Sequence, residues 1–322
     1  MVTGGAGFVG SHLCEALLRT GVDVVCLDNM VTGAERNLTD FADHPRLTVQ
    51  TVDVTDDLRV DGPVDLVLHL ASPASPYDYL RLPVETMTAN SIGTLHALEL
   101  AETKQARFVL TSTSEAYGDP QVHPQPETYW GNVNPVGPRA VYDEAKRFAE
   151  ALTTAFRSAR GVDTAIVRLF NSYGPRMRSH DGRAVPTFIR QALDGAPLTV
   201  AGDGSQTRSV CFVADTVRGI LAVAGADLSG PVNVGSRQEM TVLDIARDVI
   251  GATGSSSSIE FVPLPIDDPK VRCPDTQLIE RSTGWHPTVS WPDGLSATVA
   301  SFDERRPQSA LAVSGAEQAD HR

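Results

Sequence analysis

Three things are scarce in this 322-residue sequence, and each scarcity argues against a class of protein. Cysteine occurs four times, without the close spacing of a metal motif, so we expect reduced thiols and a cytoplasmic protein. Apolar runs are too short to span a bilayer, and we expect neither a signal peptide nor a membrane partner. Lysine and arginine (27) are outnumbered by aspartate and glutamate (40), and the resulting net charge of -13 argues against nucleic acid. The cysteines are Cys14, Cys26, Cys211 and Cys273.

The chain opens on a glycine-rich turn, VTGGAGFVG, that leads into the apolar-periodic stretch SHLCEALL. Gly4 permits a tight turn, Gly7 lets the backbone approach a pyrophosphate, and Gly10 lets a helix pack on the sheet. The N–H groups of that helix would bind the phosphates. Asp28 ends the next strand, where its carboxylate suits the ribose hydroxyls and repels a 2′-phosphate, which favours NAD over NADP. We expect the cofactor to contact Gly4, Gly7, Phe8, Val9, Gly10, Asp28, Asn29, Thr32, Gly33, Asp53, Val54, Leu70, Ala71, Ser72, Tyr142 and Lys146.

Strand and helix patterns alternate through the first half of the chain. This alternation predicts a parallel sheet covered on both faces, with the ligand at the carboxyl ends of the strands. The predicted fold class is α/β, a Rossmann-type doubly wound parallel sheet over residues 1–175. Because only three residues precede Gly4, fewer than a buried strand usually has, we also expect the natural chain to start upstream.

After residue 175 the elements become shorter and mixed, which predicts a smaller mixed α/β substrate domain over 176–306. Some elements are expected to cross between the two domains, and a disordered tail is expected over 307–322. A strand is predicted at 206–213, with Asp215 capping the helix that follows. A further helix begins at Thr241, with Asp244 as the acid of a capping box.

The candidate catalytic groups lie in residues 111–146. Tyr142 and Lys146 are four residues apart and share one helix face, so a phenol and an ammonium can approach the same ligand. A nearby ammonium, and further a bound cationic nicotinamide, would favour the phenolate and lower the Tyr142 pKa. Tyr142 is therefore a candidate base. Thr113, Ser114 and Glu115 follow a predicted strand and bring hydroxyls and a carboxyl to the same substrate.

These motifs resemble the extended short-chain dehydrogenases/reductases that act on nucleotide sugars, and among them most resemble the UDP-glucuronate decarboxylases, or UDP-xylose synthases. The resemblance runs from Val2 to about Glu304. Its segments are TGGAGFVGSHL, HLASPASP, TSTSEAYGDP, HPQPETYWGNVNPVGPRAVYDEAKR, RLFNSYGPRM and GDGSQTRS. The insertion TYWGNVNP is especially specific, because it lengthens the gap between Thr113 and Tyr142 relative to 4-epimerases.

The resemblance implies an NAD-dependent decarboxylation of UDP-glucuronate to UDP-xylose that needs no metal. Tyr142 would take the proton of the sugar 4-OH while hydride passes from C4 to NAD+, with Lys146 on the nicotinamide ribose and Thr113 on the 4-oxygen. The 4-keto sugar would then lose CO2 before the hydride returns, and Glu115 with Ser114 would assist that loss or the protonation at C5. A family-like homodimer through a helix pair is expected. The UDP part and the sugar acid would contact Asn90, Asn171, Arg183, Arg208 and Arg272.

Three other functions stay open. Nucleotide-sugar 4,6-dehydratases resemble this chain but carry Thr-Asp-Glu, whose Asp protonates the departing hydroxyl, and Ser114 cannot do so. A 4-epimerase needs only the Thr or Ser, the Tyr and the Lys, and leaves Glu115 without a task. A non-catalytic NAD-binding sensor needs only the nucleotide loop. The chain also departs from the decarboxylases, which usually carry Lys, Thr and Tyr at the positions of Thr88, Ala89 and Ala201; these differences bear on which sugar is accepted.

Overall fold

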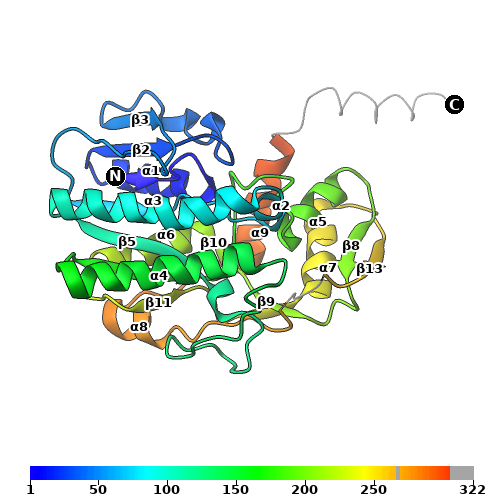
Figure 1. Ribbon diagram of the computed structural model, residues 1–322. Coiled ribbons are helices and arrows are strands. Elements are labelled where there is room, and N and C mark those ends of the chain that lie inside the picture. Colours follow the sequence, from blue (N-terminus) through cyan, green and yellow to red (C-terminus); the bar gives the residue numbers. More distant parts are fainter. Residues whose placement is uncertain (266–268, 305–322) are drawn as a thin grey trace, which may run out of the picture.

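A seven-stranded parallel sheet forms the centre of the computed structural model, which describes residues 1–265 and 269–304 (Figure 1). The strand order is β3-β2-β1-β4-β5-β6-β11. The order reverses between β1 and β4, which is the switch point of doubly wound sheets. The Rossmann-type fold class is therefore confirmed; the tail predicted at 307–322 lies outside the described residues. The strands are β1 (Val2–Thr3), β2 (Val24–Asp28), β3 (Leu47–Thr51), β4 (Leu66–His69), β5 (Arg107–Thr113), β6 (Thr164–Leu169) and β11 (Pro231–Val234).

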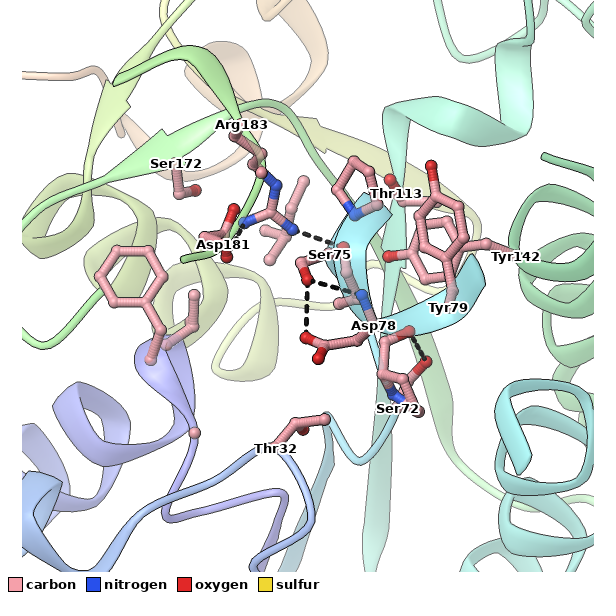
Figure 2. A pocket seen from close by; sticks show the side chains of 18 of the residues that line it. Thr32, Ser72, Ser75, Asp78, Tyr79, Thr113, Tyr142, Ser172, Asp181 and Arg183 are labelled. Atoms are coloured by element: carbon pink, nitrogen blue, oxygen red, sulfur yellow. Dashed lines mark hydrogen bonds and ion pairs between the residues drawn. The ribbon is translucent and has the colours of Figure 1, made fainter. Parts of the chain in front are cut away.

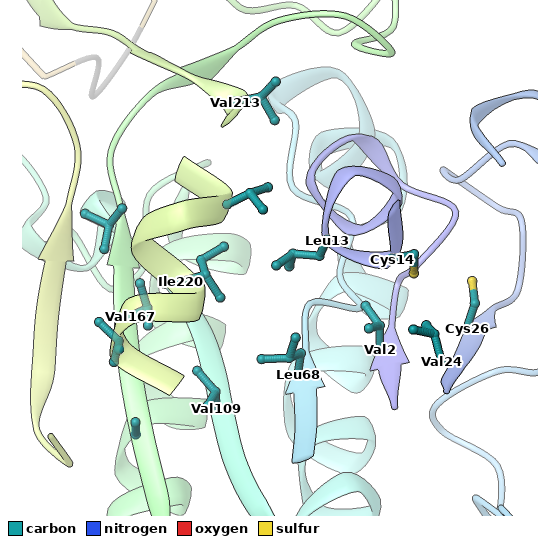
Figure 3. Close-up of a cluster of buried hydrophobic side chains, with 14 of the residues drawn as sticks. Val2, Leu13, Cys14, Val24, Cys26, Leu68, Val109, Val167, Val213 and Ile220 are labelled. Carbon is teal, nitrogen blue, oxygen red and sulfur yellow. The ribbon is translucent and has the colours of Figure 1, made fainter. Parts of the chain in front are cut away.

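Helices cover both faces of this sheet and bury an apolar layer on each. Figure 3 shows one layer, in which Leu13 of α1 and Ile220 of α6 face the strand residues Val2, Leu68 and Val109. On the other face α3 and α4 run side by side (Figure 1). In the described part of the chain, no helix combines the length and the apolarity that crossing a bilayer requires. The helices of these layers are α1 (Phe8–Arg19), α3 (Pro83–Lys104), α4 (Ala140–Arg160) and α6 (Val213–Ala224).

A third apolar cluster lies beyond the carboxyl edge of the sheet, where α5, α7 and α9 pack on short strands. In Figure 1 this region stands to one side of the large sheet. Residues of the second half also return to the large sheet, because β11 pairs with β6. The division of the chain at residue 175 stays a prediction. The remaining elements are α2 (Pro76–Arg81), α5 (Ala184–Leu193), α7 (Val242–Thr253), α8 (Gln277–Thr283), α9 (Trp291–Glu304), β7 (Ser172–Tyr173), β8 (Leu198–Ala201), β9 (Thr207–Ser209), β10 (Cys211–Phe212), β12 (Glu239–Thr241), β13 (Ile259–Val262) and the 3-10 turns Glu35–Asn37, Thr39–Phe41 and Ser114–Tyr117.

Two predictions in the second half are wrong, and one is confirmed. The single strand predicted at 206–213 is two strands, β9 and β10, which pair with different partners. Helix α6 begins at Val213, so Asp215 lies inside its first turn and does not cap it. Its buried carboxylate instead accepts the backbone N–H groups of Thr288 and Val289, at 2.9 Å each. The capping box of α7 is confirmed, because Thr241 Oγ1 accepts the N–H of Asp244 at 3.0 Å.

The contact between the first turn of α1 and the glycine turn yields a stability prediction. A Cβ at Gly10 would lie 2.1 Å from the carbonyl oxygen of Gly4, whereas a Cβ at Gly251, on the exposed side of α7, would meet nothing within 4 Å. Gly10→Ala should lower the free energy of unfolding by about 1–3 kcal/mol, because backbone must move. Gly251→Ala should raise it by about 0.4–1 kcal/mol. Urea unfolding monitored by circular dichroism measures both, and equal stabilities would contradict the close approach.

Candidate active site

A cavity of about 610 Å³ follows the carboxyl edge of the large sheet. Gly4, Asp28, Leu70, Thr113 and Asn171, which follow or end five different strands, all line it. The facing wall is formed by Ser172, by some of the residues in 177–188 and 199–210, and by Arg272. In Figure 2 this wall is represented by Ser172, Asp181 and Arg183, opposite Thr113 and Tyr142. The expectation that the ligand-binding edge lies at the carboxyl ends of the strands fits this cavity, whereas the roles of the individual site residues stay a prediction.

The turn between β1 and α1 provides a bare backbone surface at one end of the cavity. Gly4 has a φ of +67°, and its N–H donates to the carbonyl of Leu27 at 2.7 Å. Gly10 has no room for a Cβ, so the first turn of α1 lies directly on this loop. A phosphate group could therefore approach the N–H groups at the start of α1 without meeting side chains.

Asp28 and its neighbours form the next part of the cavity. The Asp28 carboxylate accepts the N–H groups of Ala6 at 2.9 Å and Met30 at 2.8 Å. Burial raises the pKa of this carboxyl, and the two N–H groups oppose the rise. Asp53 lies nearby and accepts a hydrogen bond from the side chain of Asn29 at 2.7 Å. Bare turn, helix start and acidic strand end together fit the phosphates and the ribose of a dinucleotide.

Of the residues expected to contact the cofactor, all but Gly33 line the cavity. Gly33 faces the Asp28 carboxylate, from which a Cβ would be 2.6 Å away. Glycine at this position therefore leaves room for the Asp28 side chain.

Tyr142, Lys146 and Thr113 come together where α4 passes the end of β5. Tyr142 and Lys146 are buried, and the Lys146 ammonium lies 5.9 Å from the centre of the Tyr142 ring. Its Nζ donates to the carbonyl of Thr111 at 3.0 Å. Burial lowers the pKa of Lys146 to about 8, against the charge of Glu150.

The predicted lowering of the Tyr142 pKa is wrong for this arrangement. Burial raises the pKa of Tyr142 to about 12, and the charge of Arg183 and the hydroxyl of Thr113 only partly oppose it. Desolvation outweighs the nearby cations because the phenol is almost fully enclosed. The ring of Tyr79 contributes to this enclosure, since it stacks on Tyr142 with centroids 5.1 Å apart and planes 7° apart (Figure 2).

Glu115 occupies the centre of a charge cluster in which Arg272 is buried and Glu115 and Arg139 are partly buried. Its carboxylate accepts hydrogen bonds from Arg272 on both oxygens, one of them at 2.9 Å, and from Arg139 at 2.5 Å. Burial alone would raise the pKa of Glu115, but the charges of Arg272 and Arg139 outweigh it and hold that pKa well below its usual range. Glu115 is therefore an ionised carboxylate and not a proton donor. Glu115 and its two arginines together carry one positive charge in excess. The buried Asp143 carboxyl, whose pKa burial and the charge of Glu115 raise to about 7, offsets that excess when it is ionised.

The residues expected to contact the substrate are placed differently from one another. Asn171, Arg183 and Arg208 line the cavity as expected. Arg272 also lines it, but pairs with Glu115. Asn90 does not line it: its side chain is completely buried and donates to Ser72 Oγ and to the carbonyl of Thr86, at 2.8 Å each.

Asn90 faces inward from α3, so the expectation that it touches the sugar is wrong for this structure. It orients Ser72, which does line the cavity.

Sequence reasoning missed Arg139, Tyr79 and a second ion pair in the cavity wall. Asp78 is buried, accepts the hydroxyl of Ser75 at 2.6 Å and pairs with Arg178 (Figure 2 labels Asp78 and Ser75). The position of Arg139 near the site could have been predicted from the sequence, because it precedes Tyr142 by three residues, which is close to one helical turn. Asp78 also had a signal, because Ser75 and Asp78 are three residues apart and form a capping box at the start of α2. Tyr79 had none, since its stacking partner Tyr142 lies far away in the chain.

Comparison with known proteins gives relatives for nearly the whole chain. The chain is 46% identical to UDP-glucuronic acid decarboxylase 1 of Danio rerio over 302 residues, which are 94% of this chain and 72% of that protein. Among solved structures it resembles DesIV, a dTDP-glucose 4,6-dehydratase from Streptomyces venezuelae solved with NAD, at a TM-score of 0.86 and 29% identity, covering 95% of this chain and 97% of that one.

A UDP-glucuronic acid 4-epimerase from Bacillus cereus, solved with UDP-glucuronic acid and NAD, has a TM-score of 0.84 and 28% identity, covering 95% of this chain and 99% of that one. The family model described as "NAD dependent epimerase/dehydratase family" matches residues 1–235. A family match of this length, together with relatives of this identity, shows that the chain belongs to the NAD dependent epimerase/dehydratase family.

Proposed function

We propose that this chain is an NAD-dependent decarboxylase that converts UDP-glucuronate to UDP-xylose. The observation that carries the proposal is the ionised Glu115 between Arg139 and Arg272, beside Thr113 and Tyr142. The two arginine charges exceed the one charge of Glu115, which suits a substrate that brings one carboxylate while the neighbouring Asp143 is protonated. The 46% identity to a UDP-glucuronic acid decarboxylase over 94% of the chain supports the same assignment.

The roles of the catalytic residues are part of this proposal. Bound NAD+ would supply a reversible hydride acceptor for C4 of the sugar and a positive charge that favours the phenolate of Tyr142. Tyr142 Oη accepts the proton of the 4-hydroxyl, and Thr113 Oγ1 holds the 4-oxygen at the end of β5. Lys146, fixed on the carbonyl of Thr111, is one helical turn further on and directs its charge to the same place.

Decarboxylation follows from the position of the new carbonyl. The C5 carboxylate is then β to the C4 ketone, so the C5–carboxylate bond can break with its electron pair passing to the ketone as an enolate. CO2 leaves, and C5 is protonated afterwards. In this proposal Arg272 binds the sugar carboxylate, because Arg139 can keep Glu115 paired while Arg272 turns. Loss of CO2 moves the negative charge to the enolate oxygen, and protonation at C5 then removes it. Arg272 can afterwards pair with Glu115 again.

The alternatives are weaker for physical reasons. A 4,6-dehydratase needs an acid that protonates a leaving hydroxyl, whereas Glu115 is held ionised and Ser114 is a hydroxyl. A 4-epimerase of UDP-glucuronate would use the same carboxylate-binding cluster, so it remains the second candidate, supported by the likeness to the Bacillus cereus enzyme. A non-catalytic sensor would have no need of a buried Tyr142 beside Thr113.

A homodimer through α3 and α4 is a further part of the proposal. The outer surfaces of these neighbouring helices expose Val84, Met87 and Ile92 on α3 and Phe148 on α4. Exposed apolar side chains on adjacent helices are suited to a symmetric interface. The cytoplasmic location stays a prediction.

Incubation with UDP-glucuronate and mass spectrometry of the nucleotide sugar tests the reaction. Loss of CO2 and formation of UDP-xylose are expected. Tyr142→Phe should lower the rate by at least about 100-fold, because the general base is removed. Binding of NAD to the variant, measured by calorimetry, should be retained, which separates lost chemistry from lost folding. An unchanged mass with a new stereoisomer would assign the chain as a 4-epimerase instead.

Arg139→Gln should lower kcat/KM by about 10- to 100-fold, because a charged hydrogen bond is lost and Arg272 must stay with Glu115. Removal of the Arg139 charge should also raise the pKa of Glu115, because that charge lowers it in the wild type. The ionised form is the active one, so the acid limb of the kcat/KM profile should move to higher pH.

Arg139→Lys should restore part of the rate. Arg160→Gln, at the far end of the same helix on an exposed ion pair with Glu102, is the matched control and should behave as the wild type. A pH profile for Arg139→Gln that coincides with that of the wild type would exclude the charge role.

Sedimentation velocity tests the dimer. Phe148→Asp should shift the protein toward the monomer, because it places a charge in the proposed interface. Trp130→Asp is the control, since Trp130 is 87% exposed but lies outside both helices. A wild-type monomer, or equal behaviour of the two variants, would contradict an interface on α3 and α4.

A further inference from the structure

A second cluster of reactive side chains lies outside the cavity lining. His123, Glu239 and Cys273 come from three separate segments, and one possible ligand atom of each lies within 4.8 Å of the other two. His123 Nε2 is 2.9 Å from a carboxylate oxygen of Glu239. Cys273 is buried, whereas His123 and Glu239 are exposed, so the cluster opens to solvent on one side.

We propose that His123, Glu239 and Cys273 form a zinc-binding site that fixes the segment carrying Arg272. An imidazole nitrogen, a carboxylate oxygen and a thiolate sulfur are the ligand types that Zn²⁺ takes in proteins. Three protein ligands leave a fourth tetrahedral position for water on the exposed side. One carboxylate and one thiolate balance the charge of the ion, so no charge would be left uncompensated.

Hydrogen bonds around the cluster hold the ligands in place without the ion. Gln125 is two residues from His123; its N–H donates to the carbonyl of Cys273 at 2.8 Å, and its side-chain oxygen accepts the N–H of Cys273 at 2.9 Å. Thr207 donates to the second carboxylate oxygen of Glu239 at 2.7 Å. Such outer contacts orient metal ligands and keep them from turning away.

Metal binding here is an exchange of protons for the ion. Zinc binds cysteine as the thiolate, so the Cys273 thiol must give up its proton. The S–H bond must therefore break as the Zn–S bond forms, and the proton leaves to solvent through the open side. The hydrogen bond between His123 and Glu239 is replaced by a bond from each to the ion. Zinc affinity should consequently rise with pH.

The site would act on the cavity wall and not on the chemistry. Arg272 directly precedes Cys273, and its carbonyl accepts the N–H of Ser209 at 3.1 Å. Ser209 in turn lies opposite Glu239 in the pairing of β9 with β12. A zinc ion bound by Cys273 and Glu239 would therefore restrict the motion of the segment that carries Arg272, whose side chain pairs with Glu115. The proposal stands on its own and does not depend on which sugar is the substrate.

Metal content and cobalt spectroscopy of the tag-free full chain test this site. Protein grown with zinc should retain about one Zn²⁺ per chain, and removal by a chelator should lower the melting temperature. Co²⁺ added to the stripped protein should give the ultraviolet charge-transfer band of a cobalt–thiolate bond. Cys273→Ser should abolish that band, whereas Cys211→Ser, which changes another buried thiol, should keep it.

His123→Gln changes an exposed side chain, so it tests the site without risk to folding, and it should abolish zinc retention. Thr207→Ala should weaken zinc binding by about 10-fold or more, since it removes an outer contact. Zinc retained equally by His123→Gln and the wild type would overturn the site, as would the spectrum of free aqueous cobalt in the wild type.

Discussion

The carboxylate of Glu115 joins three parts of the chain that are far apart in sequence. It follows β5, and its two cationic partners are Arg139, at the start of α4, and Arg272, on the segment before α8. The backbone carbonyl of Arg139 also accepts the N–H of Tyr142 at 3.0 Å. Arg139 therefore couples the position of the catalytic phenol to that of the carboxylate. The geometry of the site depends on the ion pairs of Glu115 with Arg139 and Arg272.

A largely buried charge cluster of this kind is a poor source of stability. Removing three ions from water costs several kcal/mol each, and their attraction returns that only when the hydrogen bonds are well made. An apolar replacement would pack as well and avoid the cost. What the cluster does provide is a binding preference, because its two arginine charges exceed the one charge of Glu115 and can pair with one more carboxylate. A neutral sugar would not add a carboxylate to the two arginines, which is a physical basis for selecting an acidic one.

Features set by neighbouring residues could be predicted from the sequence, and features set by distant contacts could not. The glycine turn and the α7 capping box depend on residues within one or two turns, and both predictions matched the structure. Asp215 was misplaced because its partners, Thr288 and Val289, are more than seventy residues away. The pKa of Tyr142 was misjudged for a related reason. The neighbouring Lys146 is visible in the sequence, whereas the enclosure of the phenol, to which Tyr79 contributes, is visible only in the fold.

The departures from the decarboxylase pattern gain meaning from their position. Thr88, Ala89 and Ala201 all line the cavity, but none belongs to the cluster of Glu115 or to the group of Tyr142, Lys146 and Thr113. A Tyr ring at position 201 would offer a stacking surface worth about 1–3 kcal/mol to a nucleobase, and Ala201 offers none. A Lys at position 88 would add a positive charge that Thr88 lacks. We expect both changes to raise KM and to leave kcat nearly unchanged, because neither alters a group that moves protons.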